Sequence, residues 1–322
     1  QQAVHEIPVL EIKYFPDENN DGRLDQEETG RNDTLNSIRT EVRNLSSKTI
    51  ESLEKASKYH GYKDPNAIAS LDYNVIDQKE YLINIPKSTQ FAPFANHIDI
   101  LNNINICDYV DNRGVKEVWI WMYHTDRVVP IESNMAMGNI SRDFWNRGYY
   151  GDVSNSYQQK DLPVCEKTYT VYNYNYRDQG LGSALENHNH QMEWVFNYIN
   201  RNLFWNKWVS PFGQPSPQIN SCGWSHSPPN TTDGYDWCNK TTVLSNCEDW
   251  NPDGSGEIKE INCYTWDSDC EHDCGDFFKI WWMQNLPGKD NDLYYVGKKL
   301  RNWWDFIGDF DAALQIGKNL TY

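Results

Sequence analysis

Apolar positions along the first 200 residues follow two alternating spacings. Short apolar or alternating runs, typical of strands, occupy residues 7–15, 81–85, 115–123 and 168–176. Apolar side chains spaced by three and four residues predict helices over 36–59, 98–110 and 181–199, with a potential break at Ser46 and Ser47. Strands that alternate with helices predict an α/β fold with a largely parallel sheet and flanking helices.

The pattern changes after residue 205. Residues 206–275 are rich in proline, asparagine and glycine, show little periodicity and predict a long, loop-rich, disulfide-tied cap. Residues 277–286 and 303–314 regain helical spacing, so 276–322 is expected to be a helical C-terminal part packed on the core. We expect one domain over 1–322, with the α/β core in 1–205 and a polar excursion over 133–163.

The charge balance limits the classes of partner. The 322-residue chain has 29 Lys+Arg against 46 Asp+Glu, a formal charge of −17. Such a surface repels phosphate backbones, which argues against nucleic acid, and suits divalent cations and neutral or cationic substrates. The longest apolar run, 115–123, is far shorter than the roughly 18 residues of a membrane span.

Cysteine usage indicates an oxidising compartment. The chain has eight cysteines and no Cys-x-x-Cys pair, which favours disulfides over zinc. Proximity along the chain predicts Cys107–Cys165, and then Cys238–Cys247, Cys270–Cys274 and Cys222–Cys263.

A start at Gln1-Gln2 is expected after loss of a signal peptide, although a trimmed chain would look the same. Secretion is therefore expected, and sequons that permit N-glycans occur at Asn32, Asn44, Asn139, Asn230, Asn239 and Asn319.

The acidic stretch 17–28 has the spacing of a calcium-binding loop. Side-chain oxygens fall at positions 1, 3, 5, 9 and 12, glycine at 6, and Arg23 at 7 needs to offer only its backbone carbonyl. The expected ligands are Asp17, Asn19, Asp21, Arg23, Asp25 and Glu28. These twelve residues resemble the loop of EF-hand proteins, but a strand precedes them, so the resemblance implies a structural Ca²⁺ site rather than a sensor. The alternative is an acidic turn closed by Asp-Gly.

A second stretch, 249–260, repeats this spacing. Its candidate ligands are Asp249, Asn251, Asp253, Glu257 and Glu260. Gly256 replaces the apolar residue at position 8, and Pro252 stiffens position 4. In a chain this rich in Asp and Asn, the pattern indicates either a second calcium ion or a coincidence.

Helix 181–199 has an apolar stripe and an opposite polar face. His188 falls on the apolar stripe and is expected to be a hydrogen-bonded core residue. Glu186, His190 and Glu193 share the other face, where spacings of three and four align them. They form either a metal-ligating or acid–base group under the cap, or a solvated polar face.

The end of strand 115–123 is the second candidate site. Ligands of open α/β sheets bind beyond the carboxyl ends of strands, which singles out His124 and Glu132. Proline and isoleucine precede Glu132, which suggests partial burial of its carboxyl group. A pair such as Glu132 with Glu193 would suit glycoside hydrolysis. His226 and Asp236 in the cap either line a substrate groove or satisfy loop backbone.

Aromatic content bears on the substrate. The chain has fourteen tryptophans, most of which are expected to fill the core, while exposed rings stack on sugars.

Three stretches, 114–121, 222–237 and 278–288, resemble a group of secreted proteins of unassigned function. The resemblance implies one continuous domain and assigns no catalytic role.

Two functions follow from these patterns. The first is a secreted, calcium-stabilised hydrolase of polysaccharides that uses Glu132, Glu193 and His190 for acid–base catalysis. The second is a non-catalytic extracellular protein, either glycan-binding or part of a surface layer. A metalloenzyme with His190 and Glu193 as ligands is a third, less favoured reading.

Overall fold

The structure is a computed structural model that describes residues 4–89, 93–139, 141, 153, 162–177, 180–209, 221–231, 233–271 and 274–322. The chain divides into two compact units. The sheet unit comprises Glu6–Ile50 and Tyr73–Gln191, and the C-terminal unit comprises Gln1–His5, Glu51–Asp72 and Met192–Tyr322. Within the described ranges, none of the helices has the length and apolar character needed to cross a membrane.

A five-stranded sheet organises the sheet unit. Its strands are β1 (His5–Tyr14), β2 (Leu71–Tyr81), β3 (Glu117–Met122), β4 (Ser133–Ala136) and β5 (Tyr169–Asn175). They lie in the order β2-β1-β3-β5-β4; β1, β3 and β5 pair in parallel and β4 runs antiparallel to β5. The predicted α/β fold with a largely parallel sheet is confirmed, as is the concentration of disulfides in the C-terminal region.

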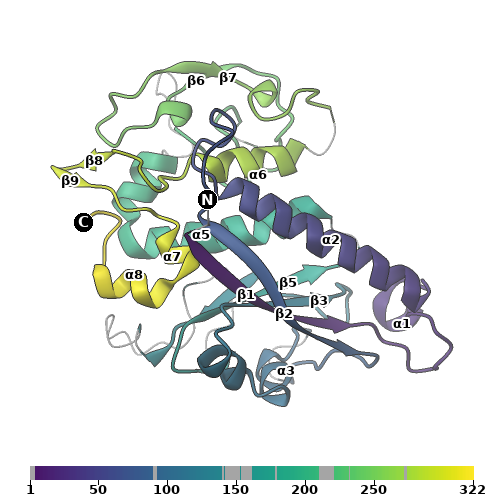
Figure 1. The fold of residues 1–322 in the computed structure, drawn as a ribbon. Coiled ribbons are helices and arrows are strands. Elements are labelled where there is room, and N and C mark those ends of the chain that lie inside the picture. Colours follow the sequence, from purple (N-terminus) through teal and green to yellow (C-terminus); the bar gives the residue numbers. More distant parts are fainter. Residues whose placement is uncertain are drawn as a thin grey trace. The chain divides into compact units, whose positions relative to one another are not determined.

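Helices cover both faces of this sheet. The sheet-unit parts of α2 (Leu35–Ala56) and α5 (Leu181–Leu203) lie on one side of it, and α3 (His97–Asn103) lies on the other (Figure 1). Two shorter elements, α1 (Gln26–Thr29) and the π-helical turn η1 (Asp108–Asn112), complete the unit. The chain thus passes from β1 through α2 to β2, and from β2 through α3 to β3.

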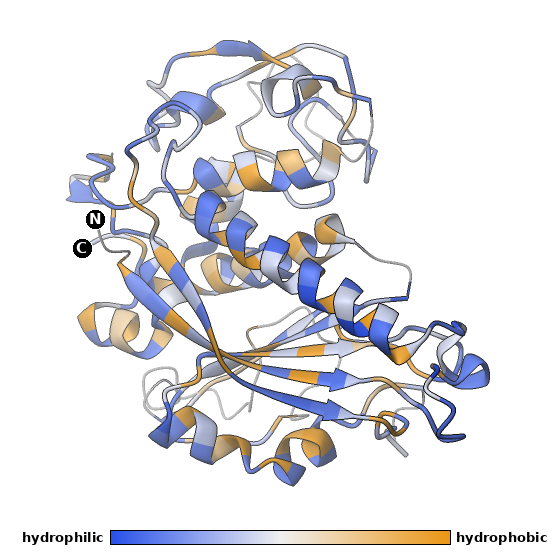
Figure 2. Cartoon of the chain, turned by 45° about the vertical axis from the view of Figure 1, so that its right-hand side comes forward, coloured by the Kyte–Doolittle hydropathy of each residue, from blue (hydrophilic) through white to orange (hydrophobic). Residues whose placement is uncertain are grey.

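The two faces of the sheet differ in chemistry. Parallel register aligns Glu11 with Trp119 and Trp119 with Tyr172, so polar and aromatic side chains line the face toward α2 and α5. The Glu11 carboxylate accepts hydrogen bonds from Ser46 Oγ of α2 (2.5 Å) and Trp121 Nε1 (3.2 Å). Figure 2 shows hydrophobic and hydrophilic residues interspersed along the strands of the sheet. Alternation along β1 and β3 places mainly aliphatic side chains on the opposite face. The buried polar groups are therefore concentrated on one side.

His188 of α5 belongs to that polar and aromatic face. Its ring stacks on Tyr172, with 3.8 Å between ring centroids, and its Nε2 is 2.7 Å from the Tyr174 hydroxyl. Burial lowers the pKa of His188 to about 3, so it stays neutral. The prediction of a hydrogen-bonded core histidine is confirmed.

Several predicted element boundaries were wrong. Residues 81–85 are not the second strand, which runs over Leu71–Tyr81; charged residues along this edge strand hide its alternation. No break occurs at Ser46 in α2, because its hydroxyl is satisfied by Glu11. The helix expected over 98–110 ends at Asn103, and the helix expected over 303–314 is two short helices, α7 (Asp305–Gly308) and α8 (Phe310–Ile316). Most of the expected excursion at 133–163 lies outside the described residues.

The C-terminal unit contains short elements besides the ends of α2 and α5. Its described helices and turns are η2 (Phe204–Val209), η3 (Cys247–Asp249), η4 (Cys263–Thr265), α6 (Cys274–Gln284), α7 and α8. Two small hairpins, β6–β7 (Val243–Ser245 with Lys259–Ile261) and β8–β9 (Tyr294–Tyr295 with Lys298–Lys299), complete the list.

Aromatic rings build the core of this unit. Trp208 packs edge-on against Trp282 with 4.8 Å between centroids, and both lie near Phe204. Trp303 contacts Phe204 and Trp250 from another side. Among the residues that the structure describes, nine of the chain's fourteen tryptophans are buried, so the prediction that most of them fill the core is confirmed.

Four disulfides stabilise the fold. Cys107–Cys165 forms as predicted, but the other three predicted pairs were wrong. The observed bridges are Cys222–Cys247, Cys238–Cys274 and Cys263–Cys270. Trp237 packs on α6, with Lys279 Nζ 3.7 Å from its ring centroid, and this contact brings Cys238 to the first residue of that helix. Spatial packing, not proximity along the chain, selects these partners.

Glu117 of β3 makes folding stability depend on pH. Burial raises its pKa to about 7 from 4.5, partly offset by hydrogen bonds from Trp119 Nε1 and the Tyr73 hydroxyl. A raised carboxyl pKa means that its contribution to stability is complete below about pH 4.5 and is lost as the pH rises to about 7. We expect Glu117→Gln to raise the free energy of unfolding above pH 7 by on the order of 1–3 kcal/mol.

Urea denaturation across this pH range measures the effect. Glu117→Gln should flatten the decline in stability between about pH 4.5 and 7. The exposed Glu51→Gln, which also removes one negative charge, should leave the decline unchanged. An identical slope in Glu117→Gln and the wild type would contradict the assignment.

Candidate functional site

Two carboxylates and an imidazole converge in the sheet unit. Glu132 Oε2 lies 3.8 Å and Glu186 Oε1 lies 3.7 Å from His190 Nε2. The side chain of His190 is 5% exposed and that of Glu186 is 14% exposed, whereas that of Glu132 is 45% exposed. The group thus has a buried side, supplied by α5, and an open side, supplied by Glu132. We call these three residues the Glu–His–Glu cluster.

Backbone pairing at the carboxyl end of β5 positions the cluster. Glu132 directly precedes β4, and its carbonyl oxygen accepts the Asn173 N–H of β5 (3.2 Å). The Asn173 side-chain oxygen accepts hydrogen bonds from Ile131 N (3.1 Å) and His97 Nε2 (2.8 Å). Asn187 Nδ2 of α5 donates to the Asn173 carbonyl (2.7 Å). One buried asparagine therefore joins the Glu132 connection, α3 and α5.

The arrangement suits proton transfer or cation binding. The distances of 3.7 and 3.8 Å are too long for direct hydrogen bonds but short enough for strong electrostatic interaction. Both carboxylates approach the same imidazole nitrogen, so the two measured oxygens are at most about 7.5 Å apart. A water molecule, a proton or a metal ion can be shared by such a group.

The other predicted catalytic residues have different surroundings. Glu193 is buried in the C-terminal unit, where its carboxylate accepts the Ser225 N–H at 2.6 Å. Asp236 accepts a hydrogen bond from Asn239 Nδ2 (2.7 Å). His124 follows β3 with an exposed side chain, and its N–H donates to Asn175 Oδ1. Of the predicted catalytic set, the sheet unit brings together Glu132 and His190.

The first calcium-like loop forms a hollow of about 400 Å³ whose walls include Asp17, Asn19, Asp21 and Asp25. The Asp17 carboxylate accepts the N–H groups of Asp21 (3.0 Å) and Gly22 (3.1 Å), which curls the chain around it. Gly22 has φ +80°, a conformation that a β-carbon would resist. Oxygen atoms in this hollow are the ligands that Ca²⁺ prefers.

Glu28, the expected twelfth ligand, is held elsewhere. Its buried carboxylate accepts the Tyr123 hydroxyl (2.8 Å) and pairs with Lys87 Nζ at 2.6 Å and Arg127 Nη1 at 3.8 Å. The candidate ligands at positions 1, 3, 5 and 9 therefore line one hollow, whereas the carboxylate at position 12 contacts Tyr123, Lys87 and Arg127 at the carboxyl edge of the sheet.

In the second calcium-like loop, residues 249–260, carboxylates accept hydrogen bonds from backbone N–H groups of the same loop. Asp249 Oδ2 accepts the Glu257 N–H (2.7 Å), and Asp253 Oδ1 accepts the Ser255 N–H (2.9 Å). Glu260 belongs to β7, opposite Leu244 of β6. Backbone N–H groups thus occupy the carboxylates of Asp249 and Asp253, as they do that of Asp17 in the first loop, and the second calcium ion stays a prediction.

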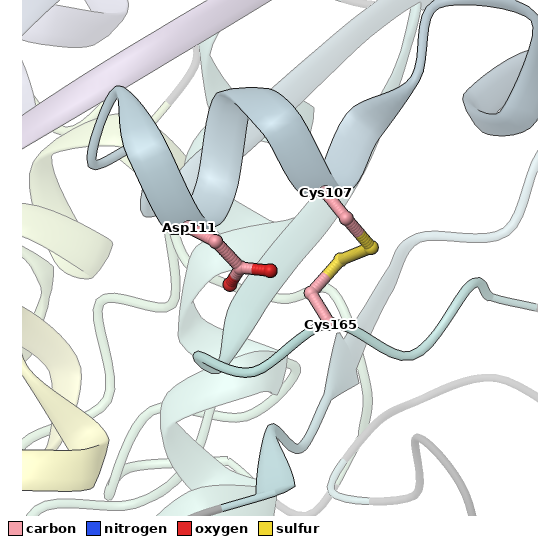
Figure 3. A group of neighbouring side chains, drawn as sticks. All are labelled: Cys107, Asp111 and Cys165. Atoms are coloured by element: carbon pink, nitrogen blue, oxygen red, sulfur yellow. A yellow bond between two sulfur atoms is a disulfide. The ribbon is translucent and has the colours of Figure 1, made fainter.

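A third group, Cys107, Asp111 and Cys165, looks like a metal site by distance alone. Figure 3 shows the two sulfur atoms joined in a disulfide, which leaves no thiolate to bind a metal. The Asp111 carboxylate accepts the N–H groups of Glu166 (3.2 Å) and Lys167 (3.0 Å). This group holds the segment before β5 on η1 and is structural.

Comparison with known proteins adds no assignment: no protein-family model matches the chain, and no curated protein sequence is similar to it. The chemistry of the clusters must therefore carry the interpretation.

Sequence reasoning missed the partners of Glu28. Lys87 and Arg127 lie far from it along the chain and carry no motif. It did place Glu186 and His190 on one helical face, but paired Glu132 with Glu193 instead of Glu186. The residues of one helix were predictable from spacing, whereas their partner from another element was not.

Replacement of Glu28 should destabilise the fold without any calcium. We expect Glu28→Gln to lower the free energy of unfolding by on the order of 1–2 kcal/mol in the presence of a chelator, because Lys87 and Tyr123 lose a buried ionised acceptor. Chemical denaturation measures the change. The neighbouring, exposed Glu27→Gln is the control and should be neutral. Equal stability of the two variants would contradict a structural role for the Glu28 carboxylate.

Proposed function

We propose that the protein is an extracellular hydrolase of polysaccharides whose reaction takes place at the Glu–His–Glu cluster. The observation that carries this proposal is the approach of two carboxylates, one half-exposed and one buried, to the buried His190 Nε2. Glycoside hydrolysis uses two acidic groups around one bond, one to protonate the leaving oxygen and one to activate water.

We give the acid role to Glu132 because its half-exposed side chain can reach a bound polysaccharide. Glu132, on the open side, protonates the glycosidic oxygen as the bond to the anomeric carbon breaks. Water adds to that carbon, and its proton passes to the buried Glu186–His190 pair. The upper limit of about 7.5 Å on the separation of the two carboxylate oxygens is compatible with the roughly 5–5.5 Å of retaining glycosidases and with the lower part of the roughly 6.5–9.5 Å range of inverting ones.

Disulfide chemistry supports an extracellular location. Four disulfides in one chain persist in oxidising compartments and are rare where glutathione keeps thiols reduced. N-glycans would then be carried by exposed sequons such as Asn32, Asn44 and Asn139. Asn230 is a poor acceptor, because its buried amide donates to the carbonyls of Asn239 and Thr241.

Replacement of Glu132 tests the catalytic role. We expect Glu132→Gln to lower kcat by about 10²–10⁴-fold with little change in KM, because the amide cannot transfer a proton. Release of reducing ends from a panel of neutral polysaccharides measures the rate. The exposed Glu166→Gln, which removes a charge from the same unit, should keep wild-type activity. Full activity of Glu132→Gln on a substrate that the wild type cleaves would refute the assignment.

One observation favours a non-catalytic glycan-binding protein as the second candidate. In the C-terminal unit, the rings of Trp224, His226, Tyr235 and Trp237 follow one another with 4.8, 4.5 and 5.4 Å between centroids. Tyr235 is 59% exposed and has φ +66°, an unfavourable conformation for a bulky residue. Polysaccharide binding without any released reducing ends would favour this reading.

Calcium is proposed as a structural ion in the hollow around Asp17, Asn19, Asp21 and Asp25, with the Arg23 carbonyl as a further ligand. The supporting observations are the curled backbone and the hollow of about 400 Å³. An ion that binds only the folded chain stabilises it by mass action.

Thermal unfolding tests this ion. We expect Ca²⁺ to raise the Tm of the wild type by a few degrees relative to a chelator, because saturation at about 100 times Kd adds roughly 2.7 kcal/mol. Asp21→Asn should abolish most of the rise, whereas Asp253→Asn in the second loop should not. A Tm that does not respond to Ca²⁺ would remove the proposed ion.

A further inference from the structure

We propose that Glu186 and His190 bind a zinc ion, which supplies the activated water at the Glu–His–Glu cluster. The binding claim stands on the geometry of α5; only its catalytic consequence rests on the proposed hydrolase function. With zinc bound, Glu186 and His190 would serve as ligands instead of accepting the water's proton, the lowered pKa of the bound water would let that proton pass to solvent, and Glu132 would keep its role at the leaving oxygen.

The spacing of the two ligand atoms matches one ion. Glu186 and His190 are four residues apart on α5, so their side chains project from the same face. Their Oε1 and Nε2 atoms are 3.7 Å apart. Zinc bonds of about 2.0–2.2 Å to oxygen and nitrogen place two tetrahedral ligands roughly 3.4 Å apart, so a shift of a few tenths of an ångström closes the site.

The burial of Glu186 and His190 and the presence of an imidazole nitrogen favour zinc over calcium and magnesium. The side chains of His190 and Glu186 are 5% and 14% exposed, so little solvent competes for them. Imidazole nitrogen favours zinc-like transition metals, whereas Ca²⁺ and Mg²⁺ favour oxygen. The hollow at 17–25 offers only oxygen atoms, which favour calcium. In a mixture of the two metals, zinc should therefore bind at Glu186 and His190, and calcium should bind in the hollow.

We expect Glu132 to lie beside the zinc ion without being one of its ligands. Its carboxylate lies 3.8 Å from His190 Nε2 but belongs to the connection before β4, and its side chain is half-exposed. Water would complete the coordination of a zinc ion held by Glu186 and His190, and zinc lowers the pKa of bound water to about 7. Glu132 is thus adjacent to the water and accessible to a substrate.

Of the two neighbouring histidines His188 and His190, only His190 is placed to act as a ligand. It lies two residues before His190 on α5 but on the opposite face, where its Nε2 is bound to the Tyr174 hydroxyl. Stacking on Tyr172 fixes its ring. His188 is therefore committed to the core, and His190 is the histidine of α5 that meets the two carboxylates.

Metal analysis of the intact chain tests the proposal. The protein is stripped with a chelator, incubated with Zn²⁺ in excess Ca²⁺, desalted and analysed for metal content. We expect one zinc per chain in the wild type and binding weakened by more than about 100-fold in Glu186→Gln and in His190→Gln, a larger loss than outer-shell replacements cause. Circular dichroism and Tm measurements confirm that each variant is folded.

Two controls sharpen the result. Glu132→Gln should bind zinc like the wild type while its hydrolytic rate falls, which separates the acid–base residue from the ligands. His124→Gln, which removes an exposed histidine of the same unit, should also bind zinc normally. Substitution by Co²⁺ should produce visible absorption bands that are lost in His190→Gln.

Specific outcomes would overturn the proposal. They are wild-type protein that retains no zinc, His190→Gln that binds zinc as tightly as the wild type, or loss of zinc in Glu132→Gln, which would contradict the two-ligand assignment. Zinc bound at the cluster with no cleavage of any polysaccharide would refute the proposed hydrolase and leave the zinc site standing. Cleavage at the same rate by zinc-free and zinc-loaded protein would refute the catalytic role of zinc and leave the proposed hydrolase standing.

Discussion

The in-register parallel pairing of β1, β3 and β5 is the constraint on which the sheet unit depends. Because side chains of paired residues share a face, Glu11, Trp119 and Tyr172 form a row that only polar and aromatic partners can cover. Helices α2 and α5 supply Ser46 and His188 for this purpose. The same pairing brings the carboxyl ends of the strands to one edge, where the Glu28 contacts and the Glu–His–Glu cluster lie.

Buried polar groups are costly unless they are hydrogen-bonded, and this unit contains many of them. Asn173 meets part of this cost, since its side-chain oxygen accepts two hydrogen bonds and its carbonyl a third, although its buried amide nitrogen has no hydrogen-bond partner among the described residues. A change of register by one residue would break all three and turn the row of aromatic residues to the wrong face. The polar network thus specifies one register, and with it the position of Glu132 beside α5.

Features that depend on residue spacing within one helix or strand were predicted correctly from the sequence. The helical face of Glu186 and His190, the central strand 117–122 and the core position of His188 follow from spacing alone. The edge strand β2 was missed because half of its side chains face solvent, so its sequence looks like a loop. Pairings between distant segments were beyond such reasoning: Cys238 meets Cys274 only because Trp237 packs on α6, and Glu132 meets His190 only because β4 pairs with β5.

The position of Glu28 has a consequence for how the proposed calcium ion could be coordinated. A loop whose last ligand is held by Lys87 and Tyr123 lacks the bidentate carboxylate that gives intracellular calcium sensors their high affinity. At the proposed site, a calcium ion would therefore bind fewer protein oxygens than in a complete EF-hand loop, and water would complete its coordination.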